Sequence, residues 1–393
     1  MTSRLGPLLV VGASARAVAQ SAAAAGFEVS AIDLFNDADL LAVAGDVRRS
    51  HRFPSDVLPL QRELPPGPWL YTGGLENYPR LVERITNERP LLGCTPAVLR
   101  QVRDVGRIAR FATRCDSVVV PEFVTADDVD GDRVPAGPWL VKRRRSSGGL
   151  GVERWAPTEG PLPRGSYLQR EITGTSYGAS FLSNGNECRF LGLAEQLAQP
   201  AADGSAPFRY AGSITLPMLA ADDRERLTRL GQSLVEEFGS IGLFGVDLIR
   251  TSDGRWYLLE VNPRPTASME LWEPAGEGPS LIELHARIFL TGRLPQAEEL
   301  PRSELVRGKL VVYSRGLNGR VPKGFTETLL QDSRRSGETN IADIPAAGTS
   351  VEPDQPLITV LLSSPDRDDL LLGLRAMERE MLRTFVERLE KVR

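Results

Sequence analysis

The stretch GVDLIRTSDGRWYLLEVNPRP, residues 245–265, decides the fold, because it has the pattern of two strands joined by a tight turn. Asp253-Gly254 is among the pairs most favoured in a two-residue type I′ hairpin loop. A hairpin closed by that loop pairs Ser252 with Arg255, and the pairing of every other residue follows from it. The sequence therefore predicts an antiparallel sheet in this part of the chain.

This register places Asp247 directly opposite Glu260 and Gly245 opposite Asn262. On the other face it predicts two apolar pairs, Leu248 with Leu259 and Val246 with Val261. Like charges directly opposite each other destabilise a sheet, and a cation between them removes that cost. Asn262 points to the same face as Glu260 and adds a neutral oxygen, a ligand set that suits Mg²⁺. The alternative is an exposed hairpin face on which two acids coincide.

The opening of the chain belongs to a different class of fold. LLVVGAS (8–14) reads as an apolar strand, an alanine-rich helix follows to about Ala25, and FEVSAID (27–33) reads as a second strand. A strand–helix–strand unit predicts a parallel sheet. A dinucleotide fingerprint needs two further glycines after Gly12, and this sequence lacks them. We therefore expect a Rossmann-like domain without a nicotinamide site.

A third strand, in WLYTGGLENYP (69–79), runs into a glycine loop that carries two polar residues. Ligands of open α/β sheets usually lie at such strand ends. Gly73, Gly74, Glu76 and Asn77 are therefore candidate substrate contacts. A purely loop-stabilising role for Glu76 and Asn77 is the equal alternative.

The segment VKRRRSSGGLGV (141–152) combines a lysine at the end of an apolar strand with a glycine-rich loop. Small residues let backbone N–H groups approach an anion closely, and Lys142 adds a point charge for phosphate. The alternative is a glycine-rich surface hairpin beside a solvated basic run.

Two further strands, LVVYS (310–314) and LITVLL (357–362), precede a closing helix for which Ser364 is the expected N-cap. The helix has one apolar stripe, which we assign to core packing or a dimer contact: Leu370, Leu374, Met377, Met381, Phe385 and Leu389.

Composition narrows the function classes. The 393 residues carry a net charge of −4, which gives no reason to expect a nucleic acid or a membrane surface as partner. No apolar run is long enough to span a bilayer. Three scattered cysteines favour a reduced, cytoplasmic protein without a disulfide framework, and two histidines nearly exclude a histidine-rich zinc site.

The lysine, the glycine-rich loop and the acidic hairpin together resemble the ATP-grasp superfamily. By this resemblance Asp247, Glu260 and Asn262 hold one or two Mg²⁺ ions, with Mn²⁺ as a substitute. The residues implied to cover the phosphates of ATP are Lys142, Ser146, Ser147, Gly148, Gly149 and Gly151.

The resemblance extends to adenine and substrate. YLQREITG looks like the hinge strand, in which Gln169 meets the adenine amino group and the backbone of Arg170, Glu171 and Ile172 completes the contact. Arg264, in EVNPRP, matches the arginine that faces the γ-phosphate and an acyl phosphate. The remaining residues that we place at the substrate are Thr266 and Ser268.

The implied architecture is α/β with α+β in three parts. These are a Rossmann-like pre-ATP-grasp domain (1–95), a two-lobed ATP-grasp domain (96–305) and a small β-rich C-terminal domain with a closing helix (306–393). Relatives with this domain order are often homodimers. More narrowly, the sequence resembles predicted ligases associated with tetrahydromethanopterin- and methylofuran-type one-carbon cofactor biosynthesis.

The implied reaction is ADP-forming ligation of a small-molecule carboxylate to an amine, with a glutamate-type amino acid as one possible substrate. The alternatives are activation of bicarbonate and a non-catalytic nucleotide-binding role. Val105 stands where many relatives have a second phosphate-binding lysine, so Arg107 or another residue has to supply that charge. His285 is expected in the core, and Cys188 lacks an adjacent base.

Overall fold

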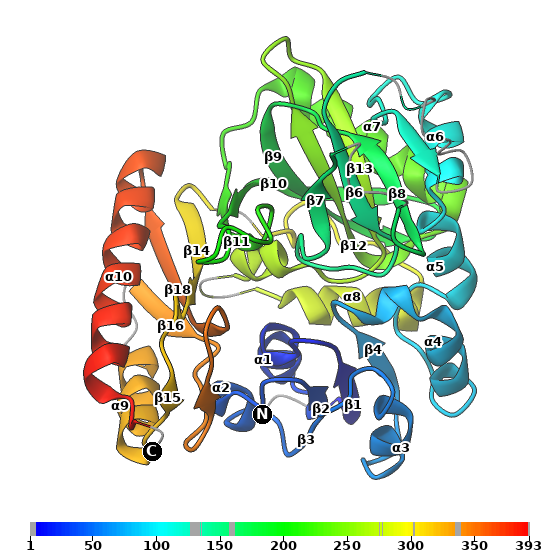
Figure 1. The fold of residues 1–393 in the computed structure, drawn as a ribbon. Helices are drawn as coiled ribbons and strands as arrows, with labels where there is room; N and C mark the ends of the chain where they lie inside the picture. The colour runs from blue at the N-terminus through cyan, green and yellow to red at the C-terminus, as the bar shows by residue number, and fades with distance from the viewer. Residues whose placement is uncertain are drawn as a thin grey trace.

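The computed structural model describes residues 5–125, 134, 136–156, 162–274, 276, 278–301, 303–334 and 339–391. Figure 1 shows three parts: a small parallel-sheet unit in blue, a larger body in cyan to yellow, and a C-terminal part in orange and red. None of the helices in the described residues has the length and apolar content that crossing a bilayer requires.

The first part contains a four-stranded parallel sheet, as the sequence predicts. Its strand order is β3-β2-β1-β4, and its elements are β1 (Pro7–Val11), α1 (Arg16–Ala24), β2 (Glu28–Asp33), α2 (Ala38–Leu41), β3 (Asp46–Arg49), α3 (Val57–Arg62), β4 (Trp69–Tyr71), η1 (Leu75–Asn77) and α4 (Pro79–Thr86). At the end of β2 the carboxylate of Asp33 accepts hydrogen bonds from the backbone N–H groups of Ala15, Phe35 and Asn36. The Asp33 carboxylate therefore links the loop that follows β1 to the loop that follows β2.

The larger body is built on an eight-stranded sheet in the order β13-β12-β9-β10-β11-β14-β18-β16. All its pairings are antiparallel, in agreement with the hairpin pattern of the sequence. The strands of the body are β9 (Thr175–Asn184), β10 (Cys188–Ala198), β11 (Tyr210–Thr215), β12 (Ile241–Arg250) and β13 (Trp256–Asn262).

The register of the β12–β13 hairpin is partly the predicted one. Asp247 pairs with Glu260 and Gly245 with Asn262, but Leu248 pairs with Leu258 and not with Leu259. The reason is that two departures from the simple hairpin cancel each other. The loop spans three residues, because Thr251 N–H bonds to Arg255 O and Gly254 has a φ of +83°, and a β-bulge between the loop and Glu260 restores the register.

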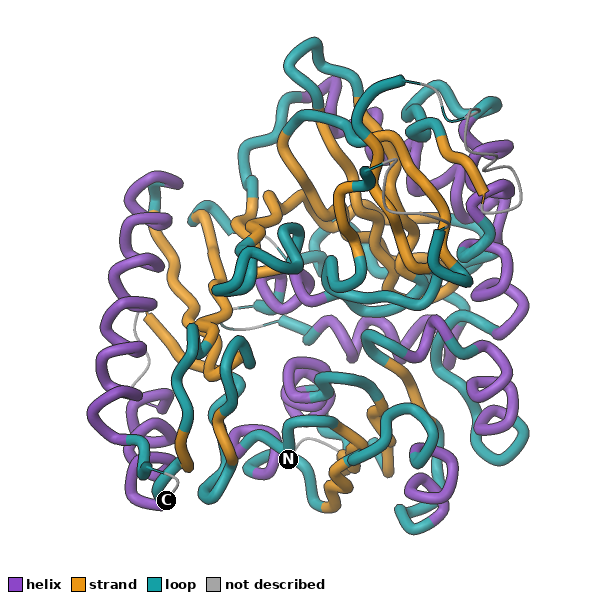
Figure 2. The backbone as a smooth tube through the Cα atoms, in the orientation of Figure 1, coloured by secondary structure: helices purple, strands orange, loops and turns teal. Residues whose placement is uncertain are grey.

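A second, four-stranded sheet in the order β5-β8-β6-β7 forms the other lobe of the body. Its strands are β5 (Phe123–Thr125), β6 (Trp139–Arg143), β7 (Val152–Arg154) and β8 (Ser166–Arg170). The helices of the body are α5 (Pro96–Val102), α6 (Val105–Ala112), α7 (Ala221–Phe238), η3 (Ala267–Trp272) and α8 (Leu281–Thr291). Figure 2 shows α8 running between the sheets of the body and the parallel-sheet unit, where it packs on α1.

The C-terminal part shares a sheet with the body, since β14 pairs with β11 and the order continues through β18 and β16. Its elements are β14 (Val306–Tyr313), β15 (Gly319–Arg320), α9 (Lys323–Arg334), β16 (Thr339–Ala342), β17 (Ser350–Val351), β18 (Pro356–Ser364) and α10 (Arg367–Arg388). Leu370, Leu374 and Phe385 of α10 are buried in a core cluster, as the apolar stripe predicts. The predicted N-cap is wrong: Asp366 caps α10, because Ser364 still belongs to β18.

Candidate active site

The paired strands β12 and β13 bring three of the predicted residues together. Asp247 faces Glu260 across the hairpin, and Asn262 Nδ2 donates to Asp247 Oδ2 at 3.2 Å. Gln196 Nε2, from β10, donates to Asp247 Oδ1 at 2.8 Å. Burial, followed by the nearby negative charge of Glu260, raises the pKa of Asp247. The face therefore holds two carboxylates that repel each other.

An ion-pair network extends from this face into the parallel-sheet unit. Arg264 Nε donates to Glu76 Oε1 at 2.8 Å, and Arg264 Nη2 reaches Asn262 Oδ1 at 3.3 Å. Arg103, the C-cap of α5, bonds to Glu260 through Nη1 and lies 3.1 Å from Glu76 Oε1 through Nη2. Burial alone would raise the pKa of Glu76, but Arg264 and Arg103 outweigh it and hold that pKa below its usual value.

The other expected substrate residues lie close in sequence to Glu76 or to Arg264, and Gly73 also lies close to the Arg264 guanidinium in space. A Cβ added to Gly73 would lie 3.6 Å from this guanidinium, and the adjacent Gly74 has a φ of +103° that favours glycine. Thr266, the N-cap of η3, is hydrogen-bonded through its hydroxyl to that of Ser268 at 3.1 Å. Small and hydroxylated residues thus border the cationic end of the hairpin.

In the other lobe, Lys142 of β6 donates through Nζ to Gln169 Oε1 of β8 at 3.1 Å. The neighbouring side chains point elsewhere, because Arg170 stacks on Trp139 and Glu171 pairs with Arg154. The backbone N–H groups of Arg170 and Glu171 bond to Glu122 O and Pro138 O. Two of the backbone groups that were predicted to contact adenine are therefore already bonded within the protein.

The glycine-rich loop is held at its start by two hydrogen bonds from other segments. Tyr210 N–H donates to Gly148 O at 2.9 Å, and Asn77 Nδ2 donates to Ser146 O at 3.2 Å. Gly148, Gly149 and Gly151 have φ of +62°, +74° and +75°, a region that residues with a Cβ rarely adopt. Ser147 lies in the same turn, where its carbonyl accepts from Leu150 N–H. Asn77 therefore stabilises the loop in this state.

The oxygen donors of the hairpin face fit a hard divalent cation. Two carboxylates in register repel each other, and Arg103 balances only the Glu260 side of the pair. The amide of Asn262 has its nitrogen toward Asp247 and its oxygen toward Arg264, so it has to turn to offer oxygen to a cation. In the described part of the chain no group of three or more His, Cys, Asp and Glu residues could hold a metal ion. The candidate site has two carboxylates and an amide.

His285 and Cys188 are both buried residues of the core. The Leu243 N–H donates to His285 Nδ1 at 2.9 Å, and Nε2 lies 3.1 Å from Leu92 O. Burial lowers the pKa of His285 to about 4, so the ring is neutral. Burial raises the pKa of the Cys188 thiol to about 12, which opposes a nucleophilic role. All three cysteines are free and buried.

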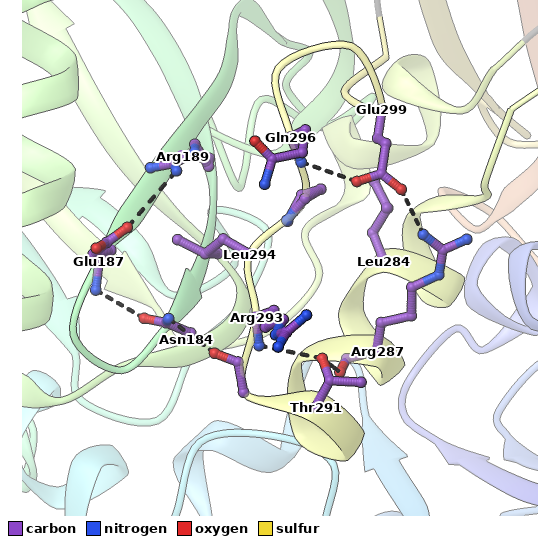
Figure 3. A pocket seen from close by; sticks show the side chains of 12 residues that line it. Asn184, Glu187, Arg189, Leu284, Arg287, Thr291, Arg293, Leu294, Gln296 and Glu299 are labelled. Carbon is purple, nitrogen blue, oxygen red and sulfur yellow. Dashed lines mark hydrogen bonds and ion pairs between the residues drawn. The ribbon is translucent and has the colours of Figure 1, made fainter.

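A surface pocket of about 430 Å³ lies between the β9–β10 turn and the end of α8 (Figure 3). Its charged side chains pair with one another: Arg189 lies 3.7 Å from Glu187, and Arg287 contacts Glu299 at 2.7 Å. None of the predicted site residues lines it. The candidate active site is thus defined by converging side chains and not by this pocket.

Comparison with known proteins agrees with the fold. Residues 112–268 match the model of the ATP-grasp domain family. A search of curated proteins found no match. The chain therefore contains an ATP-grasp domain, the domain that the lysine, the glycine-rich loop and the acidic hairpin predict.

Solved structures similar to this one cover nearly the whole chain. N5-carboxyaminoimidazole ribonucleotide synthetase from Thermotoga maritima has a TM-score of 0.66 at 16% identity, covering 95% of this chain and 98% of that one. The biotin carboxylase domain of 2-oxoglutarate carboxylase from Hydrogenobacter thermophilus has 0.71 at 15%, covering 94% and 88%. L-amino acid ligase from Bacillus licheniformis has 0.67 at 15%, covering 96% and 98%. With the domain match, these similarities show that the chain shares the fold of these proteins.

Two residues of the site were not predicted. Arg103 lies 157 positions before Glu260 in sequence, and Gln196 lies 51 positions before Asp247. A search for a cation near Val105 does point to this region, since Arg103 is two residues away. No spacing rule signals Gln196, because β9 separates its strand from β12 in the sheet.

Proposed function

We propose that the protein is an ADP-forming carboxylate–amine ligase that makes an amide through an acyl phosphate. The observation that carries the proposal is the convergence of Asp247, Glu260 and Asn262 on one hairpin face, beside Arg264. Lys142 and Gln169 lie together in the other lobe. Phosphoryl transfer depends mainly on positioning and on neutralising charge, and these residues supply both.

Each group has a role that its surroundings support. Asp247, Glu260 and Asn262 would hold Mg²⁺, which when bound screens the charge of the phosphate oxygens. Lys142 adds a second positive charge, and the loop from Ser146 to Gly151 covers the phosphates. Gln169 and the backbone from Arg170 to Ile172 contact adenine. Closure of the loop excludes water, which would otherwise hydrolyse the acyl phosphate.

In the first step a carboxylate oxygen of the substrate attacks the γ-phosphorus, the bond to the bridging oxygen breaks, and ADP leaves. The amine nitrogen then attacks the acyl carbon, phosphate departs, and the amine proton passes to solvent. Arg264 faces the transferred group and the oxyanion of the second step. The substrate residues are those around this arginine: Gly73, Gly74, Glu76, Asn77, Thr266 and Ser268.

The substrate class follows from similarity and from the sequence. One similar structure is an L-amino acid ligase, and the chain resembles predicted ligases of one-carbon cofactor biosynthesis. We therefore infer an amino acid, of glutamate type, as one partner in the amide bond. A cytoplasmic homodimer is the assembly that we expect, and sedimentation of the purified protein tests it.

The test is release of ADP and phosphate from Mg-ATP by the purified protein. A panel of amino acids and pterin- or furan-linked carboxylates is assayed with and without amine, and bicarbonate is assayed alone. We expect release to require a carboxylate–amine pair and to fall to background in Glu260→Gln. Glu187→Gln, an exposed glutamate at the β9–β10 turn, is the matched control and retains full release.

The same assay separates the proposal from its alternatives. Release of ADP and phosphate with bicarbonate and no amine would show that the enzyme activates bicarbonate and would refute the amide-forming reaction. Nucleotide binding that depends on Glu260 and Mg²⁺, with no release for any pair in the panel, would favour a non-catalytic role. Equal release in Glu260→Gln and in the wild type would refute the assigned metal site.

A further inference from the structure

Arg103 lies between the two carboxylates that join the hairpin to the parallel-sheet unit. Its Nη1 bonds to Glu260, and its Nη2 lies 3.1 Å from Glu76 Oε1. Only 18% of its side chain is exposed, against 30% for that of Glu260 and none for that of Glu76. The guanidinium therefore occupies the polar face of Glu260 on which the proposed function places a divalent cation.

The hydrogen bonding of this arginine is incomplete. Arg103 Nε and Nη2 are buried and have no hydrogen-bond partner among the described residues, although Nη2 lies within ion-pair distance of Glu76, and Glu76 Oε2 likewise has no partner there. An unsatisfied buried donor costs roughly 1–3 kcal/mol, and more when it is charged. A guanidinium with two donors that make no aligned hydrogen bond suits a dense oxygen acceptor such as phosphate, which it can bind in a bidentate way.

Charge balance points to the same ligand. Around the hairpin, Asp247, Glu260 and Glu76 face the two guanidiniums of Arg103 and Arg264. A triphosphate carries about four negative charges and one Mg²⁺ balances half of them, so the complex adds negative charge to a site of nearly balanced charge. A guanidinium released from its ion pair within the site would offset this added negative charge.

We propose that Arg103 is a phosphate-binding residue, and that Glu260 exchanges its guanidinium for a divalent cation when the nucleotide binds. This inference rests on the proposed function only in taking the site to bind a nucleotide with a divalent cation. In the nucleotide-free protein Arg103 is the counter-ion of Glu260. In the complex its guanidinium turns to the phosphate oxygens, and Glu76 keeps it within reach.

Val105 and Arg107 are less suited than Arg103 to supply a positive charge to the phosphates. Val105, in the first turn of α6, has no charge. Arg107, two residues further along, is exposed, and its backbone N–H donates to the Asp104 side chain. Burial alone would lower the pKa of Arg103, but Glu260 and Glu76 outweigh it and hold that pKa above its usual value, so the guanidinium stays charged.

The first measurement is binding of Mn²⁺ alone, followed by the loss of the free-ion electron paramagnetic resonance signal. Arg103→Met removes the competitor for Glu260, so we expect it to bind Mn²⁺ about tenfold more tightly than the wild type. Arg107→Met, the same substitution at the exposed arginine, should leave this affinity unchanged. In a Glu260→Gln background, Arg103→Met should have no effect on Mn²⁺, which ties the gain to that carboxylate.

The second measurement is calorimetric binding of a non-hydrolysable ATP analogue with Mg²⁺. Arg103→Met should weaken it about tenfold or more, because a charge-assisted hydrogen bond to phosphate is lost. Arg103→Lys keeps the charge, so its affinities for the analogue and for Mn²⁺ should both stay within about threefold of those of the wild type. Arg103→Gln removes the charge but keeps a polar side chain, so it carries the same test if Arg103→Met does not fold.

Arg103→Met should raise the affinity for Mn²⁺ and lower the affinity for the nucleotide. Loss of a merely structural arginine would not change these two affinities in opposite directions. Weaker binding of both, or no change in either, would overturn the proposal. The Mn²⁺ comparison needs no turnover, so failure of the ligase reaction and failure of this inference are separate results. Release of ADP by the enzyme with an unchanged Mn²⁺ affinity in Arg103→Met would leave the proposed function standing and reject the exchange.

Discussion

Replacing Glu76 by Gln tests the buried charge network that joins the parallel-sheet unit to the hairpin. Glu76 is fully buried between Arg264 and Arg103, whose side chains are 10% and 18% exposed. Breaking a buried ion pair costs roughly 3–5 kcal/mol. Gln keeps the shape and one acceptor, and Arg103 retains Glu260, so we expect Glu76→Gln to lower the free energy of unfolding by about 3 kcal/mol at pH 7.

The loss has a predictable dependence on pH. The two arginines hold the pKa of Glu76 below the value of a free glutamate, so the carboxylate favours the folded state. That stabilisation is fully present above the pKa of the unfolded chain, about 4.3, and disappears as the pH falls through the lower pKa of the folded protein. The difference between wild type and Glu76→Gln should therefore shrink in acid.

Guanidinium chloride unfolding, followed by tryptophan fluorescence at a series of pH values, measures both effects. Glu83→Gln is the control, because Glu83 pairs with Arg100 on the surface, with side chains 52% and 47% exposed. A surface pair of this kind contributes roughly 0–1 kcal/mol. The reasoning is refuted if Glu76→Gln costs no more than Glu83→Gln, or if its cost is the same at acidic and neutral pH.

Two further changes have defined outcomes. His285→Gln removes a ring whose pKa burial lowers to about 4. Because the unfolded chain takes up a proton that the folded protein does not, the wild type should lose about 3 kcal/mol more stability than this variant between pH 6.5 and 4. Unfolding free energies of the two proteins that change in parallel with pH would contradict this prediction. Gly149→Ala places a Cβ 1.8 Å from Phe208 O, whereas Gly148→Ala meets nothing within 4 Å. In calorimetry the first should weaken nucleotide binding about tenfold and the second much less; equal effects would refute the role of this contact.

The sequence predicts the site residues that lie on one hairpin or one loop, because local geometry places them. Asp247 and Glu260 face each other as the pattern indicates, although the loop has three residues and a bulge compensates for it. The predicted loop type was wrong because Asp-Gly also suits a three-residue loop in which the glycine takes a positive φ. The Asp247–Glu260 pair was therefore predicted correctly only because the extra loop residue and the bulge cancel, whereas the Leu248–Leu259 pair, which lies on the loop side of the bulge, was wrong.

Contacts between distant segments are beyond such patterns. Glu76 and Arg264 are 188 positions apart, and Asn77 and Ser146 are 69 apart. The sequence marks Glu76 and Asn77 as polar residues at a strand end, and substrate contact and loop support were equally possible for both. Which partner each one meets depends on how the parallel-sheet unit packs against the body, and no local propensity determines that packing.

Because of this packing, the short helix η1 contacts two parts of the candidate site. Glu76 and Asn77 are adjacent in η1, yet the first bonds to Arg264 and the second to the carbonyl of Ser146 in the glycine-rich loop. A ligand that displaces η1 must alter both contacts together, because one turn of backbone carries both side chains. If a substrate binds against Gly73 and Gly74 as proposed, its binding would act on both contacts, because these two glycines directly precede η1.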